Sequence, residues 1–386
     1  MVRVNAGGRV SVMHRLAARD YARVAPLFAG VAQHLSAAAV LAGGCPGWVY
    51  VDAPGEPRAA FLGSPEGHFL AGEPHAAFVA ALREHMANDR AEFGDLHLVC
   101  SAEDWVPHLA TLTGGLPALA EERRYYEFNR PNVAVPATPE GFALVPVDAA
   151  LLARTGLRNY AAVAEWGMVN WGGAEAFLAR GLGMCAVHDE TIASWCLADC
   201  AVGSRLEIGI ATDPDYRRRG LAALATAATV AAALARGFDR IGWHCWTRNL
   251  GSRGVAERVG FAHIGTYTNY RCLADPARHA AETALHAARR GDRATASAWC
   301  ERAAADPTAT GRTQFHAAAV LAALGDHDAA LARLRAAVAL GGADAEVMRG
   351  ADLFIPLHAA PEWAGLLARA GADGWGIVGD MRREAR

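Results

Sequence analysis

The stretch that most constrains this chain is Leu206–Ala222, which reads LEIGIATDPDYRRRGLA. A short apolar segment is followed by a turn at Asp213, then by three arginines and a glycine, and then by an alanine-rich run typical of a helix. Unpaired backbone N–H groups and the dipole at a helix N-terminus attract anions, and arginine adds full positive charge. We therefore expect a strand, a loop and a helix that together hold phosphate.

The chain has 386 residues, which is too long for one ordinary domain. Residues 13–130 mix helical and strand patterns and contain no second basic glycine loop. Prolines at 131, 136 and 139 mark a linker, because proline lacks a donor and discourages regular structure. A second domain with alternating strands and helices is predicted over 131–274, and it contains the loop.

A helical tail is predicted over 277–386, where strand signals stop after Pro276. Gly291-Asp292 recurs as Gly325-Asp326, and this spacing of 34 residues is the period of a tetratricopeptide repeat. Two ordinary helical hairpins would give a similar pattern in such an alanine-rich sequence. The repeat interpretation predicts a surface on which a protein partner could dock.

Composition excludes several classes of function. A net charge of −3 argues against a general nucleic-acid binder. We expect no membrane span and no secretory leader, because no apolar run is long enough for either. The 8 cysteines do not have the spacing of a metal site, so we expect reduced thiols in a cytoplasmic protein and no metal.

Three short motifs carry a resemblance to a known family. They are Arg217-x-x-Gly220-x-Ala222, Asn249-x-x-Ser252 and Gly260-Phe261. The first two lie between a predicted strand and a predicted helix, and the third follows a predicted helix. Together they resemble the acetyl-CoA-binding segments of the GNAT acyltransferase superfamily, in a bacterial group with an extra N-terminal domain. The resemblance covers about residues 35–272 and is strongest over 207–261.

The resemblance implies an α/β (α+β) fold. A mixed sheet flanked by helices would form the catalytic domain, after a degenerate GNAT-like or related α+β domain. It also implies an N-acyltransferase that uses acetyl-CoA or another acyl-CoA. The acceptor would be an amine of a small molecule or a peptide, which attacks the thioester directly in a ternary complex.

The resemblance also assigns residues to the co-substrate. The strand Ile210, Ala211 and Thr212 would pair with the pantetheine arm through its backbone, and Asn249 and Ser252 would contact the arm. The pyrophosphate would rest on a loop and helix start made of Arg217, Arg218, Arg219, Gly220, Leu221 and Ala222. A solvated surface run is the alternative explanation for the three arginines.

Acyl transfer needs a base for the amine and an acid for the leaving thiolate. The resemblance implies that Glu207 is the base, because many GNAT enzymes place their base on this strand, and its apolar neighbours would raise its pKa towards a useful value. It could equally pair with an arginine or bind the acceptor. The family often places a tyrosine soon after the asparagine motif. This sequence has the motif but no tyrosine before Tyr267. Tyr267, Tyr270 and Ser252 therefore stay open as the acid, together with direct release of the thiolate.

An aromatic and polar wall is expected around the acceptor, formed by Trp166, Asn170, Trp171, Trp195, His244 and Trp246. The tryptophans could also be core residues, since they bury large areas. Such a wall fits a small or flat acceptor. A second hypothesis is a non-catalytic CoA-binding protein whose tail docks a partner. The intact loop with Asn249 favours the enzyme.

Overall fold

A computed structural model describes residues 13–89 and 93–371. Its contacts divide the chain into two compact units, and we describe each by itself. One contains residues 13–89, 97–115 and 120–270. The other contains the C-terminal helices from residue 271 onward, together with two short segments at 93–96 and 116–119.

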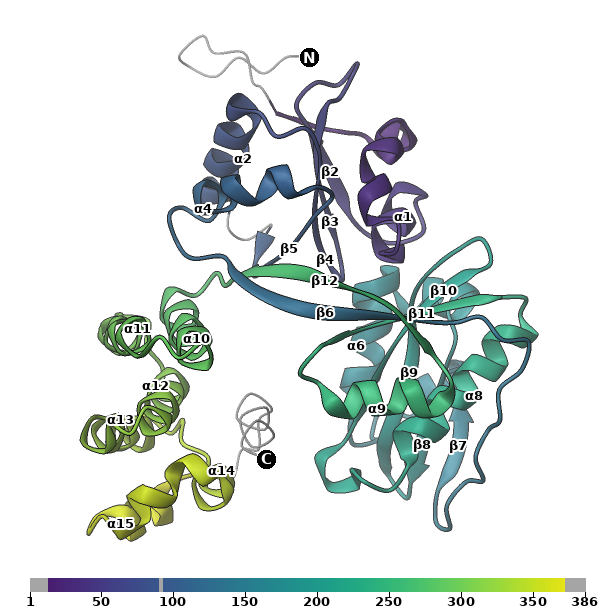
Figure 1. Ribbon diagram of the computed structural model, residues 1–386. Helices are drawn as coiled ribbons and strands as arrows, with labels where there is room; N and C mark the ends of the chain where they lie inside the picture. The colour runs from purple at the N-terminus through teal and green to yellow at the C-terminus, as the bar shows by residue number, and fades with distance from the viewer. Residues whose placement is uncertain (1–12, 90–92, 372–386) are drawn as a thin grey trace. The chain divides into compact units, whose positions relative to one another are not determined.

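The strands within the described residues form one mixed sheet (Figure 1). Its order is β1-β2-β3-β4-β5-β12-β6-β11-β10-β9-β8-β7. The bounds are β1 (His14–Arg15), β2 (Trp48–Val51), β3 (Ala59–Ser64), β4 (Gly67–Gly72), β5 (Leu96–Cys100), β6 (Leu119–Phe128), β7 (Ala143–Pro146), β8 (Gly183–His188), β9 (Thr191–Val202), β10 (Arg205–Thr212), β11 (Arg240–Trp246) and β12 (Ala262–Cys272).

Helices flank this sheet and make up the C-terminal unit. In the sheet-containing unit they are η1 (Ala18–Val31), α1 (Leu35–Leu41), α2 (Ala76–Asn88), η2 (Glu103–His108), α4 (Leu109–Leu112), α5 (Ala149–Leu152), α6 (Tyr160–Trp171), α7 (Ala174–Arg180), η3 (Pro214–Tyr216), α8 (Leu221–Ala235) and α9 (Leu250–Val259). The predicted α/β class with a mixed sheet is confirmed.

Strands before and after the proline-rich segment, which we expected to be a linker, belong to the same sheet. No helix or strand lies between Phe128 and Ala143, as the prolines predict. Yet β6, which precedes this segment, pairs antiparallel with β11, which follows it, from Arg123↔Trp246 to Phe128↔Ile241. Strands from both predicted domains are therefore neighbours in one sheet.

Strand β10 has different partners along its length. It pairs antiparallel with β9 from Arg205 to Thr212, with a bulge between Glu207 and Ile208. It pairs parallel with β11 only from Arg205 to Glu207, opposite Arg240 to Gly242. Beyond Glu207 this pairing stops, so the rest of β10 and β11 have no mutual hydrogen bonds.

Helices cover β10 and its neighbours. Helix α8 packs against β8, β9 and β10, and Leu206 and Ile208 belong to the apolar core that includes its buried face. Successive residues of a strand face opposite sides of the sheet, so the Glu207 side chain and the Cα hydrogens of Gly209 lie on the side away from α8. Helices α1 and α6 pack against β9 and shield that second face.

The sequence predicts helices over 14–35, 151–160 and 174–180, and the first two have different boundaries in the structure. The segment 14–35 contains a two-residue strand and the 3-10 stretch η1, which includes Pro26, before α1 begins. Proline removes a backbone donor and disfavours a continuous α-helix there. The helix expected over 151–160 is the short α5, and α6 takes in 165–171, which we had left between helices.

The C-terminal unit contains α10 (Pro276–Arg289), α11 (Arg293–Ala305), α12 (Gly311–Ala323), α13 (His327–Ala339), α14 (Ala345–Gly350), η4 (Asp352–Ala359) and α15 (Trp363–Arg369). Gly291 and Gly325 both have left-handed backbones, with φ of 76° and 77°. Asp292 and Asp326, which follow them, each cap the next helix through the side chain. A helical tail is therefore present. In the described part of the chain, no helix is long and apolar enough to span a membrane.

Candidate active site

The basic loop between β10 and α8 has an accessible backbone at the start of the helix. Arg218 has a φ of 65° and Gly220 a φ of 79°, so both lie in the left-handed region. Gly220 caps α8, and a Cβ built on it would meet nothing within 4 Å. Arg217, Arg218 and Arg219 are all exposed. The loop therefore presents backbone N–H groups and guanidinium groups at one helix start, as an anion site requires.

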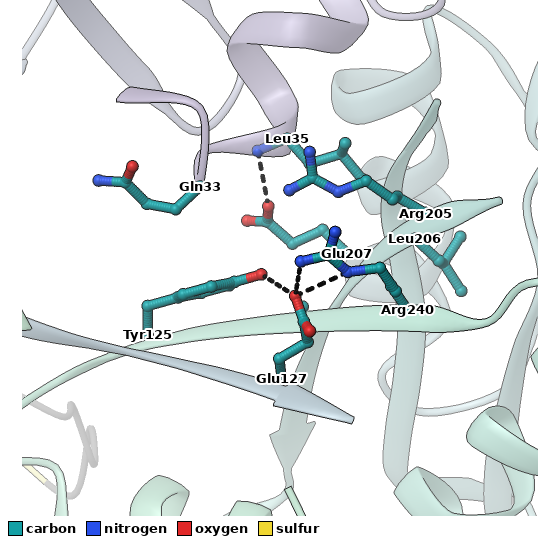
Figure 2. A pocket seen from close by; sticks show the side chains of 9 residues that line it. Gln33, Leu35, Tyr125, Glu127, Arg205, Leu206, Glu207 and Arg240 are labelled. Carbon is teal, nitrogen blue, oxygen red and sulfur yellow. Dashed lines mark hydrogen bonds and ion pairs between the residues drawn. The ribbon is translucent and has the colours of Figure 1, made fainter. Parts of the chain in front are cut away.

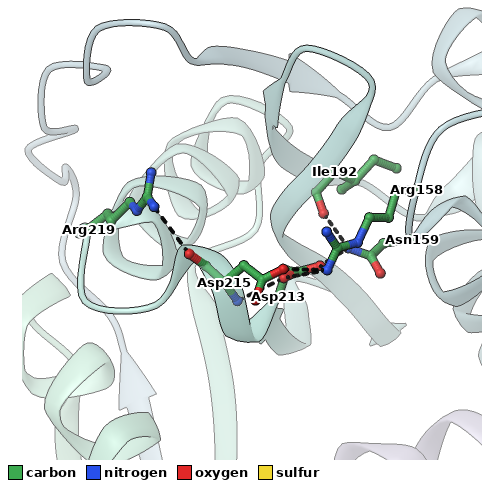
Figure 3. A network of polar contacts seen from close by, with 6 residues as sticks. All are labelled: Arg158, Asn159, Ile192, Asp213, Asp215 and Arg219. Atoms are coloured by element: carbon green, nitrogen blue, oxygen red, sulfur yellow. Dashed lines mark hydrogen bonds and ion pairs between the residues drawn. The ribbon is translucent and has the colours of Figure 1, made fainter. Parts of the chain in front are cut away.

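A polar network holds the start of this loop (Figure 3). The Asp213 side chain is only 2% exposed, and its carboxylate accepts from Arg158 Nη2 at 3.0 Å and from Asn159 Nδ2 at 2.7 Å. Arg158 also donates to Asp215 at 2.8 Å, and Arg219 donates to the Asp215 carbonyl at 3.2 Å. Our sequence analysis missed Arg158 and Asn159, which lie far from the loop in the chain.

The other residues assigned to the co-substrate already have partners within the protein. Asn249 caps α9, and its Oδ1 accepts from Ser252 N at 3.0 Å. Ser252 Oγ accepts from Trp243 Nε1 at 3.1 Å. The Ala211 carbonyl accepts from Ser194 Oγ at 3.0 Å, and the hydroxyl of Thr212 lies 2.8 Å from the same Ser194 oxygen. Their roles toward CoA stay predictions.

Glu207 is the last residue of β10 that pairs with β11. It is 4% exposed, and its Oε2 accepts from Leu35 N at 3.3 Å. Burial, with help from the negative charge of Glu66, raises its pKa to about 8, while Arg123 and Arg205 oppose the rise.

A small hollow opens beside Glu207 (Figure 2). Its walls come from both halves of the sheet-containing unit: Gln33, Leu35, Tyr125, Glu127, Arg205, Leu206, Arg240 and Gly242. Glu127 Oε2 accepts from Tyr125 Oη at 3.0 Å and from Arg240 Nη2 at 2.7 Å. The N-terminal half, in which the sequence shows no basic glycine loop, supplies Gln33, Leu35, Tyr125 and Glu127.

Two further carboxylates approach Glu207. Oxygens of Glu66, Asp199 and Glu207 all lie within 4.8 Å of one another. Asp199 belongs to the bulged part of β9, and Glu66 belongs to the turn between β3 and β4. Burial raises the pKa of Asp199 well above its usual value, and the charges of Glu66 and Glu207 add to this. We call these three residues the carboxylate cluster.

Trp166 and Asn170 lie on α6 and both contact the cluster. Trp166 Nε1 donates to Asp199 Oδ1 at 2.6 Å, and Asn170 Nδ2 donates to the same oxygen at 3.3 Å. The Trp166 ring lies over Gly209, where an added Cβ would sit 2.4 Å from its Cζ2. Of the predicted wall, these two are therefore placed beside Glu207.

The other predicted wall residues are divided between core and site. Trp171 and Trp195 are 4% and 7% exposed and pack into the apolar core. Trp246 stacks against the guanidinium groups of Arg123 and Arg248. His244 lies close to Glu207, with Nε2 3.7 Å from Glu207 Oε2.

Tyr267 reaches the site through His244. Its hydroxyl lies 3.0 Å from His244 Nδ1, and its ring meets His34 edge-on. His34 and Tyr125 stack on the His244 ring with centroid distances of 4.9 and 4.7 Å. Burial raises the pKa of Tyr267. The hydroxyl therefore belongs to the surroundings of Glu207, and its role as an acid stays a prediction.

A family model described as GNAT acetyltransferase matches residues 25–270. The chain belongs to the GNAT acetyltransferase family. It is therefore an acyltransferase, in a family whose members use acetyl-CoA as co-substrate. The match spans the loop, the carboxylate cluster and most of β12, and it ends before the helices of the C-terminal unit.

Other GNAT proteins resemble the same part of the chain. The uncharacterized N-acetyltransferase YdfB of Bacillus subtilis (strain 168) is 24% identical over 269 residues, which are 68% of this chain and 99% of that protein. A GCN5-related N-acetyltransferase-like protein from Streptococcus suis 89/1591 has a TM-score of 0.51 and 24% identity, with 66% and 98% of the two chains covered. A GCN5-related N-acetyltransferase from Sphaerobacter thermophilus has a TM-score of 0.47 and 15% identity, with coverage of 69% and 96%.

Within this GNAT chain, sequence motifs identified the basic loop and Glu207 but not their surroundings. Leu35, Glu66 and Asp199 contribute to the site through contacts between segments far apart in the chain. The sequence signal closest to such a role was Asp199, an acidic residue in the otherwise largely apolar strand that precedes β10. No sequence signal pointed to Glu66, because a glutamate is an ordinary residue in an exposed turn between two strands.

Proposed function

We propose that this chain transfers an acyl group from acyl-CoA directly to an amine of a small molecule or peptide, with Glu207 as the general base. The position of Glu207 carries the proposal. It is the last β10 residue paired with β11, beside a bulge, so it lies where the two strands part. A buried carboxylate with a pKa of about 8 is also suited to take a proton from an amine.

The basic loop fits the co-substrate of the family. Gly220 leaves open space over the helix start, and three exposed arginines surround it. The backbone N–H groups from Arg218 to Ala222 would hold the pyrophosphate, and β10 beyond Glu207 has unpaired edge groups for the pantetheine arm. When bound, acyl-CoA supplies the activated acyl thioester. Arg158 and Asn159 keep Asp213, and with it the loop entrance, in place.

Proton transfer would run through Glu207. The carboxylate accepts a proton from the acceptor ammonium, which leaves a neutral amine as the nucleophile. His244 is a positioning residue in this proposal, because its Nε2 faces Glu207 while its Nδ1 lies 3.0 Å from the Tyr267 hydroxyl. Tyr267 as the acid for the thiolate belongs to the same proposal.

Glu207→Gln tests the base. The amide keeps the shape of the side chain but cannot accept the proton, so kcat should fall about 10²–10⁴-fold, the usual contribution of a general base. The Kd for acetyl-CoA, measured by calorimetry, should stay within about twofold. Glu127→Gln is the matched control, since this carboxylate lines the same hollow but is paired with Arg240.

Unchanged turnover of Glu207→Gln at saturating acceptor would remove Glu207 as the base. Absence of heat with every acyl-CoA tested would overturn the CoA-dependent function as a whole. The opposing hypothesis, a non-catalytic CoA-binding protein, predicts acetyl-CoA binding without turnover in the unaltered chain.

We also propose that the helical tail is a tetratricopeptide-like repeat that docks a protein partner. The repeated turn supports this proposal. Gly291 and Gly325 have the same left-handed backbone, and the aspartates after them cap the next helices through the amides of Thr295 and Ala329. Helices α10 and α11 pack together, as do α12 and α13, so each Gly-Asp joins one hairpin.

A further inference from the structure

Two cysteines from distant parts of the chain meet beside the carboxylate cluster. Cys200 belongs to β9 and is the cross-strand partner of Glu207, so these two side chains lie on the same face of the sheet. It is 1% exposed and packs with residues of α1 in a small apolar cluster. Cys45 packs against the same apolar cluster, and its Sγ lies 4.0 Å from the carbonyl oxygen of Asp199. The two free thiols are therefore neighbours in the folded chain.

The segment that carries Cys45 approaches β9 closely. It reads GGCPG over 43–47 and lies shortly after α1. Gly43 has a φ of 70°, in the left-handed region that turns the chain back after the helix. A Cβ built on Gly44 would lie 3.5 Å from the carbonyl oxygen of Ala201 on β9. A disulfide has a narrow geometry, and the glycines of this segment leave the backbone around Cys45 free to meet it.

The two thiols differ in the way that disulfide formation requires. A hydrogen bond with the Cys200 thiol lowers the pKa of Cys45, with help from the charge of Arg180 and against the effect of burial. The same hydrogen bond, together with burial, raises the pKa of Cys200 well above its usual value. Cys45 is partly exposed, whereas Cys200 is buried. Cys45 is therefore the thiol that meets an oxidant from solvent first, and Cys200 waits behind it.

Cys100, Cys185 and Cys196 do not share these properties. Cys100 is partly exposed, but burial of its thiol raises its pKa to about 12. Cys185 and Cys196 are 0% exposed, and burial raises the pKa of both to about 12. These three cysteines provide comparisons within the same chain.

We propose that Cys45 and Cys200 are a peroxide-sensitive pair that closes into a disulfide and ties the segment after α1 to β9 beside Glu207. The sulfur of Cys45 attacks one oxygen of hydrogen peroxide, the O–O bond breaks and water leaves, which converts Cys45 to a sulfenic acid. The sulfur of Cys200 then attacks the Cys45 sulfur as its own proton is lost, the S–O bond breaks and a second water leaves. Two thiols are oxidised, and one peroxide is reduced to two waters.

The disulfide joins two elements that contact the proposed base. Helix α1 begins at Leu35, whose amide donates to Glu207 Oε2 at 3.3 Å, and β9 carries Asp199 of the carboxylate cluster. A bond between residues far apart in the chain restricts the unfolded state, so oxidation stabilises the fold. The pair operates without acyl transfer, so its test is separate from that of the proposed function.

Oxidation of the full-length chain with hydrogen peroxide tests the pair. Mass spectrometry of peptides prepared without reductant should show the Cys45 peptide joined to the Cys200 peptide, in a chain that remains a monomer on non-reducing electrophoresis. Cys185 and Cys196 should still react with an alkylating reagent after denaturation. The melting temperature should rise by about 4 °C or more and return to its starting value after reduction with dithiothreitol.

Single substitutions separate the two steps. In Cys200→Ser the reaction should stop after the first step, so that dimedone traps Cys45 as its sulfenic acid. In Cys45→Ser the thiol of Cys200 should stay free at the same dose of peroxide. Cys100→Ser is the matched control and should form the disulfide as the unaltered chain does.

Several outcomes would overturn the pair. They are the absence of the linked peptide, a disulfide between two copies of the chain, and equal oxidation of Cys200 in Cys45→Ser. A linked peptide with an unchanged melting temperature would overturn the part of the proposal in which the disulfide ties α1 to β9.

Discussion

The basic loop and the carboxylate cluster are built in different ways. The loop occupies one continuous stretch, residues 213–222, and its shape follows mainly from residues close in the chain, such as the cap of Asp213 on Asp215 N and the left-handed Gly220, although Arg158 and Asn159 also hold Asp213. The cluster draws on Glu66, Asp199 and Glu207, and neighbours from several other elements complete it. Local sequence therefore specifies the co-substrate side, while the acceptor side depends on the assembled sheet.

Gly220→Trp should produce the largest effect and tests the local half of this comparison. A tryptophan would be strained at a φ of 79° and would fill the open space over the helix start. We expect acetyl-CoA affinity to fall at least about 100-fold by calorimetry, which corresponds to about 2.7 kcal/mol.

Gly237→Trp is the matched control for this change. Gly237 lies at the other end of the same helix, with a φ of 87° and equally open surroundings. Its substitution carries the same backbone strain but lies away from the loop. Equal losses of affinity in the two variants would show that strain in α8, rather than the loop itself, controls binding.

The difference between the two regions also explains what the sequence could predict. The sequence predicts a strand over 205–212 and a helix over 174–180, and β10 and α7 have these bounds, because alternation and helical spacing are local patterns. Glu207 was found through the family resemblance of its strand, with support from its apolar neighbours on β10. Its contact with Leu35 N spans 172 residues, and no periodicity or motif could reveal it.

Pairing across the sheet was equally hidden. β6 reads as the last strand of the N-terminal half, and only the structure shows that it pairs with β11 and places Tyr125 opposite His244. The residues of the predicted acceptor wall are divided between the site and the core for the same reason. Trp166 can lie on β10 because residue 209 is glycine, whereas Trp171 donates to the Ala198 carbonyl within the core.

A pH profile tests the assembled half of the comparison, with a smaller effect. Glu207 must be ionised to act as a base, so kcat/KM should rise about tenfold per pH unit below its pKa of about 8 and level off above it. The groups that act on this carboxyl are Glu66, Arg123, Arg205 and the backbone N–H of Leu35.

Glu66→Gln separates this titration from that of the acceptor amine. Removing the negative charge of Glu66 should lower the pKa of Glu207, so the rise should move to lower pH while the acceptor's own pKa stays fixed. A rise that stays in place in Glu66→Gln would assign it to the amine or to another group, and the cluster would not control the base.

Arg158→Ala should have the smallest effect. It tests whether the shape of the loop depends on contacts with residues far away in the chain. Arg158 is half exposed, so its ion pairs with Asp213 and Asp215 are screened by solvent, and Asn159 still holds Asp213 after the change. We expect acetyl-CoA to bind about three- to tenfold more weakly, with the fold intact by circular dichroism. Arg154→Ala, an exposed arginine on the same segment, is the control and should bind normally. A loss as large as that of Gly220→Trp would mean that the loop, too, is held by distant contacts, and the contrast between the two regions would disappear.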